Sequence, residues 1–341
     1  MISKKIKIAI NGFGRIGRTT FQRALEFNDI EIVAINDLTD AKTLSYLLKY
    51  DSVYGRYERD VNSKKNAIIV DGKEYKILAE KDPERLPWED LGVDLVLECT
   101  GFFTEKEGAG KHLKAGTKKV IISAPSKSED IPTYLMGVNE EQYNSGKDDL
   151  ISNGSCTTNC LAPVVKVIDD HFDIRQALMN TIHSYTSTQS IVDSPCEKDF
   201  RRGRAAAINL VPTTSGAAKT VGKAIPKLSE IFDGFAVRVP TPCVSLADVT
   251  CHITKDTAVE EVNRKFEEAS KSEKMKGILA IEYEPKVSSD YIKDPRSAIV
   301  DGTLTQMIGK NFLKVISWYD NEWGYSCRLV DMARMVGSKV N

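Results

Sequence analysis

Cys156 has both the residue type and the position of a reactive thiol. It lies in the segment 152–160, which we expect to open a helix that ends near Asp169. A thiol at a helix N-terminus faces unpaired backbone N–H groups, which stabilise the thiolate, lower its pKa and raise its reactivity. A free cysteine is also often a small buried hydrophobe, so position alone leaves both interpretations of Cys156 open. Cys160, one turn further on, is expected to lie deeper and to pack.

His183 is the histidine best placed to serve such a thiol. It closes the strand-like run 178–183 and precedes a polar loop, a position that suits a base or an ion-pair partner for a thiolate. The alternative is a structural histidine, the interpretation we take for His112 and His171, whereas His252 in a strand pattern is ambiguous. No histidine pairs with a cysteine or carboxylate at ligand spacing, so no metal site is expected.

A glycine-rich turn near the N-terminus has the pattern of a dinucleotide site. A strand pattern at residues 6–11 runs into Gly12-Phe13-Gly14-Arg15-Ile16-Gly17 and then a helical stretch. Gly12 permits a tight turn, Gly14 lets a pyrophosphate approach the backbone, and Gly17 lets helix and strand pack closely. The phosphates then lie at a helix N-terminus, where free N–H groups and the dipole favour negative charge. The alternative is a glycine-rich turn without a ligand.

Asp37 follows Gly17 by 20 positions, at the end of the second strand pattern. A carboxylate at that point accepts hydrogen bonds from the adenosine ribose hydroxyls. It also repels a 2′-phosphate, which favours NAD over NADP. Without the glycine pattern, Asp37 would be an ordinary residue of a strand-end turn.

Two further features could bind anions. Residues 212–219 place hydroxyl side chains and a glycine at a helix start, which fits either a phosphate cradle or an ordinary N-cap. Arg238 interrupts an apolar strand pattern, where a cation is either salt-bridged or directed at an anionic substrate. The basic cluster at 201–204 is a solvated face, an oligomer contact or part of a phosphate site.

Composition excludes several classes of partner. The 341 residues include 47 Lys and Arg against 48 Asp and Glu, so no net field attracts nucleic acid or an anionic membrane. No apolar run approaches the length of a bilayer-spanning helix, and the N-terminus enters a strand pattern without a signal-peptide core. Seven scattered cysteines without a Cys-x-x-Cys pair indicate a reducing compartment. We expect a cytoplasmic protein.

The elements that must position these residues form two different patterns. In the first third, strand patterns at 5–11, 30–37, 95–98 and 120–123 alternate with helical patterns at 15–28 and 106–114. This alternation predicts an α/β fold with a Rossmann-type, doubly wound and mostly parallel sheet. After Cys156, longer strand patterns at 176–183, 234–240, 244–253 and 311–319 predict a second α+β domain with a mixed or antiparallel sheet. The join near Ser155 places Cys156 between the domains.

Taken together, these motifs make the whole chain resemble the phosphorylating glyceraldehyde-3-phosphate dehydrogenases. The resemblance rests on Ile10-Asn11-Gly12-Phe13-Gly14-Arg15-Ile16-Gly17-Arg18, Asn36-Asp37, residues 49–52, Ser155-Cys156-Thr157-Thr158-Asn159, His183-Ser184-Tyr185-Thr186, residues 213–219, Arg238-Val239-Pro240-Thr241-Pro242 and residues 318–325. These segments occur in order from near one end of the chain to near the other, and together they are highly specific.

The resemblance implies a reaction. His183 would activate Cys156, whose thiol attacks the aldehyde of glyceraldehyde 3-phosphate to give a thiohemiacetal. Hydride transfer to NAD would leave a thioester, which inorganic phosphate cleaves to 1,3-bisphosphoglycerate. Thr186 and Arg238 would bind the phosphate already on the substrate. The residues implied for the attacking phosphate are Ser155, Thr157, Arg202, Ser215 and Gly216.

The resemblance also implies cofactor contacts and domain limits. Arg15 and Ile16 would meet the pyrophosphate, Thr100 and Ser123 would line the cofactor cleft, and Asn321 would fix the nicotinamide carboxamide. The expected domains are residues 1–155 for NAD, 156–319 for catalysis, and 320–341 as a C-terminal segment whose helix packs back on the NAD-binding domain. The family implies a homotetramer, with the Arg-rich segment 188–209 at subunit contacts.

Some residues depart from the family pattern, and two rival functions remain. Gly154 stands where alanine is commoner, Ser215 replaces threonine but keeps the hydroxyl, and Thr188 stands where many members have aspartate. Ser194 alters the residue before a proline associated with NAD use, which leaves strict exclusion of NADP open. An erythrose-4-phosphate dehydrogenase would be expected to lack the turn at 213–216, which is present here. A non-catalytic binding protein would not need the nucleophile, the base and both anion-binding features.

Overall fold

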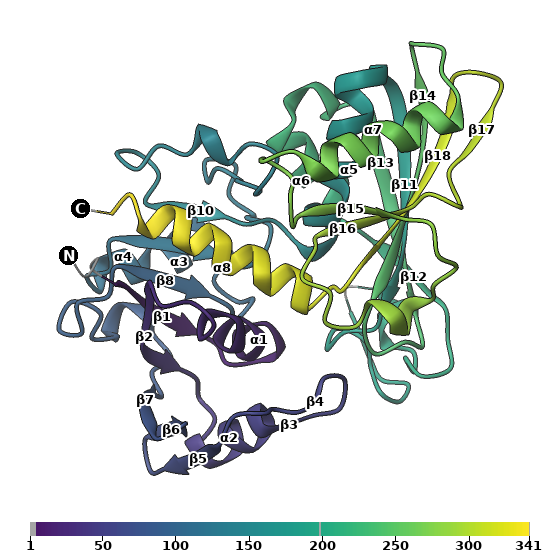
Figure 1. Cartoon of the computed structure of the whole chain (residues 1–341). Helices are drawn as coiled ribbons and strands as arrows, with labels where there is room; N and C mark the ends of the chain where they lie inside the picture. The colour runs from purple at the N-terminus through teal and green to yellow at the C-terminus, as the bar shows by residue number, and fades with distance from the viewer. Residues whose placement is uncertain (1–4, 198, 341) are drawn as a thin grey trace. The chain divides into compact units, whose positions relative to one another are not determined.

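The computed structural model describes residues 5–197 and 199–340, which separate into two compact units. Of the described residues, those within 1–134, 141–154 and 326–341 form unit 1, and those within 135–140 and 155–325 form unit 2. The last helix, α8 (Trp323–Gly337), begins in unit 2 and continues in unit 1 (Figure 1). The three domain ranges that the sequence suggested stay a prediction.

Unit 1 is built on an eight-stranded sheet in the order β10-β9-β8-β1-β2-β7-β6-β5. Pairing is parallel from β10 to β7 and antiparallel from β7 to β5. The strands are β1 (Ile6–Asn11), β2 (Ile30–Asn36), β5 (Val61–Lys64), β6 (Ala67–Val70), β7 (Lys73–Leu78), β8 (Leu95–Glu98), β9 (Lys119–Ile122) and β10 (Leu150–Ser152). The helices are α1 (Arg15–Ala24), α2 (Ala41–Lys49), α3 (Lys106–Ala109) and α4 (Lys111–Lys114), and β3 (Tyr50–Asp51) and β4 (Gly55–Arg56) form a separate hairpin.

The central strands of this sheet are buried along their length. Every residue of β8 and β9 is buried, and so is every residue of β1 except Lys7. Continuous burial is typical of parallel strands covered on both faces, which is why these segments read as apolar runs rather than alternating ones. The predicted mostly parallel sheet is confirmed.

Unit 2 contains a second sheet in the order β12-β13-β11-β14-β18-β16-β15, with β17 paired to β18. Two neighbouring pairs, β11 with β13 and β15 with β16, are parallel, and the remaining pairs are antiparallel. The strands are β11 (Ile174–Ser184), β12 (Val211–Thr214), β13 (Phe232–Val239), β14 (Ser245–Ile253), β15 (Leu279–Glu282), β16 (Ala298–Asp301), β17 (Gln306–Ile308) and β18 (Phe312–Tyr319). The predicted mixed sheet is therefore confirmed.

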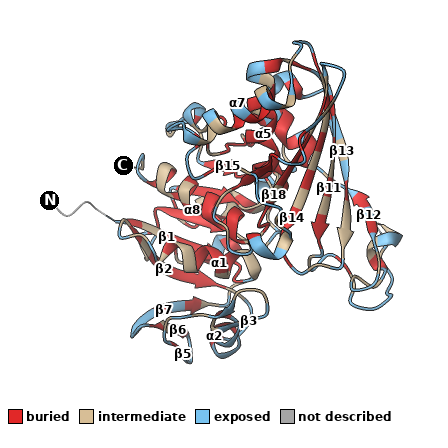
Figure 2. Cartoon of the chain, turned by 45° about the vertical axis from the view of Figure 1, so that its right-hand side comes forward, coloured by how far each residue is buried: buried red, intermediate tan, exposed pale blue. Residues whose placement is uncertain are grey.

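Three helices share the core of unit 2 with one face of this sheet: α5 (Cys156–Phe172), α6 (Ala217–Ala224) and α7 (Val259–Lys271). Along β14, buried residues alternate with half-buried ones, as expected when only one face of a sheet meets a core. Figure 2 shows the buried residues gathered on α5 and on the strands beside it. The packing of α5 against this face of the sheet fixes the position of Cys156, the first residue of the helix.

Several element limits differ from the sequence patterns. The helical pattern at 106–114 forms two short helices that meet at Gly110, and the pattern at 15–28 stops being helical at Ala24. The helix after Cys156 extends to Phe172, past the predicted end near Asp169, because the side chain of Phe172 still packs into the core. Within the described residues, none of the helices is both long and apolar enough to span a bilayer.

Candidate functional site

The three glycines of the first turn have the three different environments that the sequence pattern predicts. Gly12 has a φ of +92°, and a Cβ there would lie 2.7 Å from the backbone nitrogen of Thr100. A Cβ on Gly17 would lie 2.0 Å from the carbonyl oxygen of Gly12, so helix and turn touch at that point. Gly14, the N-cap of α1, has nothing within 4 Å of its Cβ position. The backbone at the start of α1 is therefore open to an anion.

Asp37 follows β2 and lines a cavity of about 390 Å³ beside Gly12, Gly14 and Thr100. One carboxylate oxygen of Asp37 accepts a hydrogen bond from the backbone nitrogen of Phe13 at 2.8 Å, and the other accepts one from Thr39 at 2.9 Å. These bonds hold the carboxylate at the edge of the cavity. The open helix start and the fixed acid fit a dinucleotide.

The other cofactor residues implied by the family pattern are placed unequally. Thr100 lines the cavity, whereas Ser123 and Ile16 are not among its lining residues, although Ser123 directly follows β9. Arg15 forms an ion pair with Asp51, and its guanidinium lies 5.6 Å from the centre of the Tyr54 ring.

In unit 2, Ser155 is the N-cap of α5, and Cys156 is the first residue of the helix. The Ser155 hydroxyl accepts a hydrogen bond from the Thr158 backbone nitrogen at 3.0 Å, and the Thr158 hydroxyl accepts one from the Ser155 nitrogen at 3.2 Å. This reciprocal capping box fixes the turn that carries the thiol. Cys160 is fully buried, as predicted, with its sulfur 3.5 Å from the Ser317 hydroxyl.

The thiol and the predicted base are in contact. The Sγ of half-buried Cys156 lies 3.5 Å from Nε2 of His183, near the end of β11. Arg238 is the parallel partner of His183 on β13, and its Nη1 lies 2.6 Å from His183 Nδ1. A nucleophile, a ring nitrogen and a cation are thus brought together by residues 156, 183 and 238, far apart in sequence.

The protonation of this group differs from the sequence-based prediction. Burial raises the pKa of the Cys156 thiol, although the positive charge of Arg238 and hydrogen bonds from Thr157 act in the opposite direction. The predicted lowering of this pKa is wrong, because withdrawal from water outweighs the stabilisation at the helix start. Burial, and then the charge of Arg238, lower the pKa of His183 to about 3. A neutral thiol therefore faces a neutral imidazole, and reaction requires proton transfer to the ring.

His183 Nδ1 has two competing neighbours. It lies 2.7 Å from the Ser184 carbonyl oxygen, which can only accept, and beside the Arg238 guanidinium, which can only donate. With its proton on Nδ1, the ring pairs with Ser184 and presents a bare Nε2 to the thiol. That tautomer is the one able to act as a base.

Tyr319, which the residue-by-residue prediction missed, contacts both the helix that carries Cys156 and the strand that carries His183. Its hydroxyl lies 2.9 Å from the Thr157 hydroxyl and 2.8 Å from that of Thr181, and its ring is 5.9 Å from the His183 ring. Burial raises the pKa of Tyr319. The sequence did offer a signal for Tyr319, because the residue ends the strand pattern at 311–319 and lies inside the motif at 318–325.

Asn321 is buried and oriented by a neighbouring strand. The Ser245 hydroxyl donates to its side-chain oxygen at 2.9 Å and accepts from the Ser184 backbone nitrogen at 3.1 Å. Val244, directly before Ser245, has a φ of +68°, a strained conformation for a β-branched residue. Its carbonyl oxygen accepts a hydrogen bond from the Ser184 hydroxyl at 2.8 Å. The amide of Asn321 is thereby linked through Ser245 to Ser184, the residue after His183 at the end of β11.

Three of the five residues expected at the attacking-phosphate site share one cavity. Arg202, Ser215 and Gly216 line an open cavity of about 930 Å³ together with Lys219. Arg202 donates to the Thr213 hydroxyl at 2.8 Å, and the Cβ position of Gly216 is open at the start of α6. Ser155 and Thr157 are not among the residues that line this cavity.

Thr186, expected at the substrate phosphate, follows β11 in the loop that leaves His183. Its backbone nitrogen donates to the Gln189 side chain at 2.9 Å, and its hydroxyl lies 2.9 Å from that of Thr188. Arg238 lies near the end of β13, the parallel neighbour of β11, so Thr186 and Arg238 belong to the same end of the sheet.

Comparison with known proteins decides the family. The family model described as "Glyceraldehyde 3-phosphate dehydrogenase, NAD binding domain" matches residues 6–106, and the corresponding C-terminal domain model matches residues 155–321. The chain is 53% identical to glyceraldehyde-3-phosphate dehydrogenase 1 of Bacillus cereus, over 98% of this chain and 99% of the relative. It is 53% identical to the Geobacillus stearothermophilus enzyme over the same shares, and 48% identical to glyceraldehyde-3-phosphate dehydrogenase B of Aspergillus oryzae over 97% and 98%.

The chain belongs to the glyceraldehyde-3-phosphate dehydrogenase family. Its match to the family's NAD-binding model identifies NAD as the cofactor, in agreement with the fit of the glycine turn. The predicted fold class is that of the family as well.

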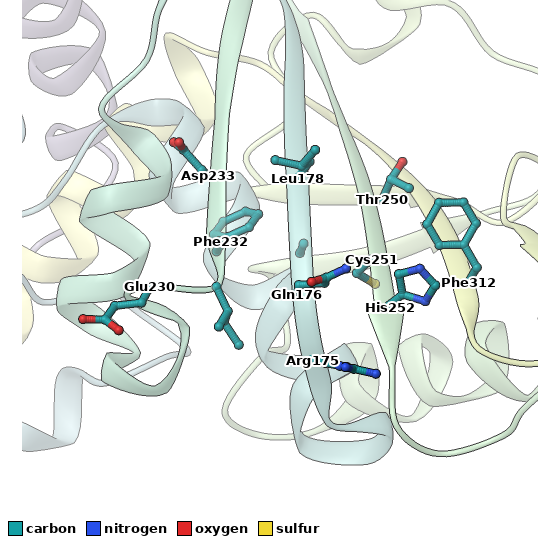
Figure 3. A pocket seen from close by; sticks show the side chains of 12 residues that line it. Arg175, Gln176, Leu178, Glu230, Phe232, Asp233, Thr250, Cys251, His252 and Phe312 are labelled. Atoms are coloured by element: carbon teal, nitrogen blue, oxygen red, sulfur yellow. The ribbon is translucent and has the colours of Figure 1, made fainter.

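A third cavity, of about 500 Å³, lies on the face of the unit 2 sheet that points away from α5 (Figure 3). The ambiguous His252 lies here, with its ring centre 4.6 Å from that of Phe312. No group of three or more potential metal ligands occurs within residues 5–197 and 199–340. Its lining mixes apolar side chains, such as Leu178 and Phe232, with charged ones, such as Arg175 and Glu230.

Proposed function

We propose that this chain catalyses the reversible, NAD-dependent oxidative phosphorylation of glyceraldehyde 3-phosphate to 1,3-bisphosphoglycerate. The observation that carries the proposal is the 3.5 Å approach of Cys156 Sγ to His183 Nε2. A thiol with a raised pKa is a poor nucleophile by itself, and a neutral ring nitrogen in contact with it supplies the missing base.

The first step follows from this contact. Nε2 of His183 takes the thiol proton while Sγ forms a bond to the aldehyde carbon, giving a thiohemiacetal. The carbonyl oxygen that gains negative charge is stabilised by N–H groups at the start of α5. This carbon would then lose a hydride, for which NAD would be the acceptor when bound, and Cys156 would carry a thioester.

The second step releases the product. An oxygen of inorganic phosphate forms a bond to the thioester carbon and the carbon–sulfur bond breaks. The departing sulfur of Cys156 takes back the proton held on His183 Nε2, and the acyl phosphate leaves. Arg202, Ser215 and Gly216 are the residues we propose for this phosphate, since they line one open cavity with Lys219. Ser155 and Thr157 would contribute from the start of α5.

Arg238 has two roles in this proposal. Together with Thr186 it binds the phosphate already on the substrate, where a guanidinium forms strong charge-assisted hydrogen bonds. Its engagement by that phosphate also relieves the competition at His183 Nδ1, which leaves the Ser184 carbonyl as the ring's partner. Substrate binding thereby favours the tautomer with a bare Nε2.

For the cofactor, we propose that Gly12, Gly14, Gly17, Arg15 and Ile16 receive the pyrophosphate and Asp37 the adenosine ribose. Thr100 and Ser123 would line the nucleotide cleft, and Asn321 would orient the nicotinamide carboxamide. The C-terminal segment 320–341 is proposed to pack back on the NAD-binding domain.

We further propose a cytoplasmic homotetramer. Apolar side chains are strongly exposed in and beside the segment 188–209: Ile191 at 88%, Phe200 at 85% and Ile208 at 81%. Large apolar side chains exposed together on one segment are typical of subunit contacts. Light scattering after size-exclusion chromatography gives the mass, and a stable monomer would contradict this part of the proposal.

The deciding experiment measures NADH formation from glyceraldehyde 3-phosphate with and without phosphate or arsenate, and with NAD or NADP. We expect activity that depends on phosphate or arsenate and prefers NAD. Equal rates without phosphate would reject the phosphorylating function and favour a non-phosphorylating relative, such as an erythrose-4-phosphate dehydrogenase.

Alkylation tests the enzyme against a non-catalytic binding protein. Iodoacetate should abolish turnover in proportion to label on Cys156, as located by peptide mass analysis. Full turnover with a completely labelled Cys156 would exclude the thiol mechanism.

A further inference from the structure

Three polar side chains end neighbouring strands at the nucleotide cavity of unit 1. Asn11 ends β1, and in the sheet register it is the partner of Asn36 at the end of β2 and of Glu98 at the end of β8. All three residues are buried, with Glu98 only 1% exposed. Asn11 and Asn36 line the cavity, whereas Glu98 is not among its lining residues.

Glu98 accepts hydrogen bonds from four donors. One carboxylate oxygen accepts from Nδ2 of Asn11 at 2.5 Å and lies 3.1 Å from Nε2 of His112. The other accepts from the backbone nitrogen of Thr100 at 2.8 Å and from the Thr100 hydroxyl. A carboxylate satisfies four donors in this way because it has two acceptor oxygens and no proton of its own.

Trp88 fixes the direction of this network at one end. The indole nitrogen of Trp88 donates to His112 Nδ1 at 2.9 Å, and an indole N–H can only donate. His112 must therefore carry its proton on Nε2, which donates to Glu98. Asn11 Nδ2 also lies 3.3 Å from His112 Nε2. These two atoms are both donors, and they are close because both donate to the same oxygen of Glu98.

The backbone of Glu80 fixes the other end. Its N–H donates to the Asn36 side-chain oxygen at 2.9 Å, and its carbonyl accepts from Asn36 Nδ2 at 2.9 Å. This pairing sets the orientation of the Asn36 amide, whose Nδ2 also donates to the Asn11 oxygen at 2.7 Å. Asn11 is consequently obliged to present its own Nδ2 to Glu98.

We propose that Glu98 is a positioning residue for NAD binding, acting from behind the cavity wall. Its carboxylate joins the carboxyl ends of three strands and holds the backbone nitrogen of Thr100, against which Gly12 makes its turn. Asn11, Gly12, Asn36 and Thr100 all line the cavity. The inference rests on the proposed location of the NAD site, and it assigns Glu98 no contact with the cofactor.

Glu98→Gln tests the proposal with almost no change in volume. Whichever way the new amide turns, its NH₂ faces donors: Thr100 on one side, or Asn11 and His112 on the other. Neither His112 nor Asn36 can reverse without losing Trp88 or Glu80. We expect the Kd for NAD, measured by calorimetry, to rise about tenfold, or about 1.4 kcal/mol, with kcat at saturating NAD within about twofold.

Asp94→Asn is the matched control. Asp94 is a buried acid directly before β8, whose last residue is Glu98, and it accepts from the Lys7 backbone nitrogen at 3.1 Å and pairs with Lys118. It does not line the nucleotide cavity. This variant should lose stability but keep a Kd for NAD within about twofold.

His112→Phe provides a second test if Glu98→Gln does not fold. An aromatic ring keeps the packing against Trp88 and Phe103, and removes one donor to Glu98 together with the acceptor of the Trp88 indole N–H. We expect the Kd for NAD to rise about threefold. Unchanged NAD affinity in a folded Glu98→Gln or His112→Phe protein, or an equal loss in Asp94→Asn, would overturn the proposal.

The NAD titration does not depend on the proposed reaction. A wild-type protein that binds NAD but forms no NADH from glyceraldehyde 3-phosphate would reject the proposed activity and leave the role of Glu98 to be decided by Kd. A wild-type protein that does not bind NAD would overturn both.

Discussion

Two buried histidines in this chain, one in each unit, show opposite uses of the same ring. His112 lies between the Trp88 indole and the Glu98 carboxylate, with both nitrogens engaged. His183 lies between the Cys156 thiol on one side and the Ser184 carbonyl and Arg238 on the other. The first ring joins parts of a wall, and the second faces a reactive atom.

The difference lies in the charge of the neighbour. A carboxylate that accepts from Nε2 keeps the proton of His112 where it is, so the ring serves as a fixed donor. A cation beside His183 disfavours a second proton, which together with burial lowers its pKa to about 3. The ring nitrogen that faces the thiol is therefore unprotonated throughout the physiological range, but the same lowered pKa makes it a weaker base until the charge of Arg238 is neutralised.

Removing the nucleophile should have the largest effect. For Cys156→Ala we expect kcat/KM to fall by about 10⁴-fold or more, since no other described group contacts His183 Nε2 as a thiol does. Steady-state assays measure the loss. Cys196→Ala is the control, because Cys196 is also a half-buried free cysteine but lies in the segment 188–209. Comparable losses in both variants would argue against a specific role for Cys156.

Removing the base should have the next largest effect. His183→Asn is expected to lower kcat by about 10³-fold, within the range of a lost general base, while His112→Phe should leave kcat nearly unchanged. Stopped-flow measurement of the first turnover separates this step from product release. A similar loss of kcat in both variants would remove the contrast between the two rings.

The lowered pKa of His183 also predicts how stability depends on pH. Its folded pKa of about 3 lies below the ordinary value of 6.5, so between these values the unfolded chain binds a proton that the folded chain does not. This contribution to stability is complete above pH 6.5 and is lost progressively as the pH falls toward 3. Urea unfolding of the wild type and His183→Asn at pH 7 and 4.5 should show a smaller pH dependence in the variant.

Removing the cation should affect substrate binding and the ring together. For Arg238→Gln we expect kcat/KM for glyceraldehyde 3-phosphate to fall about 10²-fold, and far less for unphosphorylated glyceraldehyde. The pKa of His183 should rise toward its ordinary value, as measured by NMR of the ring. Equal losses with both aldehydes would show that Arg238 does not bind the substrate phosphate.

The glycines of unit 1 offer a smaller and more selective contrast. Gly17→Ala places a Cβ 2.0 Å from the Gly12 carbonyl and should destabilise the fold by about 3 kcal/mol. Gly14→Ala meets nothing within 4 Å, so we expect near-normal stability but NAD binding weakened about thirtyfold. Urea unfolding and calorimetry measure the two effects, and normal NAD affinity in Gly14→Ala would place the pyrophosphate elsewhere.

The smallest effect concerns the cavity beside α6. Ser215→Ala removes one hydroxyl and should raise the KM for phosphate about fivefold, the value of one hydrogen bond. Ser215→Thr keeps the hydroxyl and should retain near-normal KM. An unchanged KM in the alanine variant would leave the cavity without a role in phosphate binding.

Local sequence was sufficient where the site is made by consecutive residues. Gly12, Gly14 and Gly17 have the turn, the open approach and the close packing that their spacing predicts, because backbone conformation and short-range sterics decide all three. The same holds for the start of α5, where Ser155 and Thr158 form a capping box three residues apart.

Tertiary structure decided what depends on strand pairing and burial. The register of β11 with β13 puts Arg238 beside His183, and the pairing of β8 with β1 puts Glu98 beside Asn11. No local sequence motif predicts either pairing. Burial reversed the expected pKa shift of Cys156, because the loss of water depends on atoms contributed by the whole fold. The sequence by itself determined which residues could react, and the assembled sheets determined which of them meet and in what protonation state.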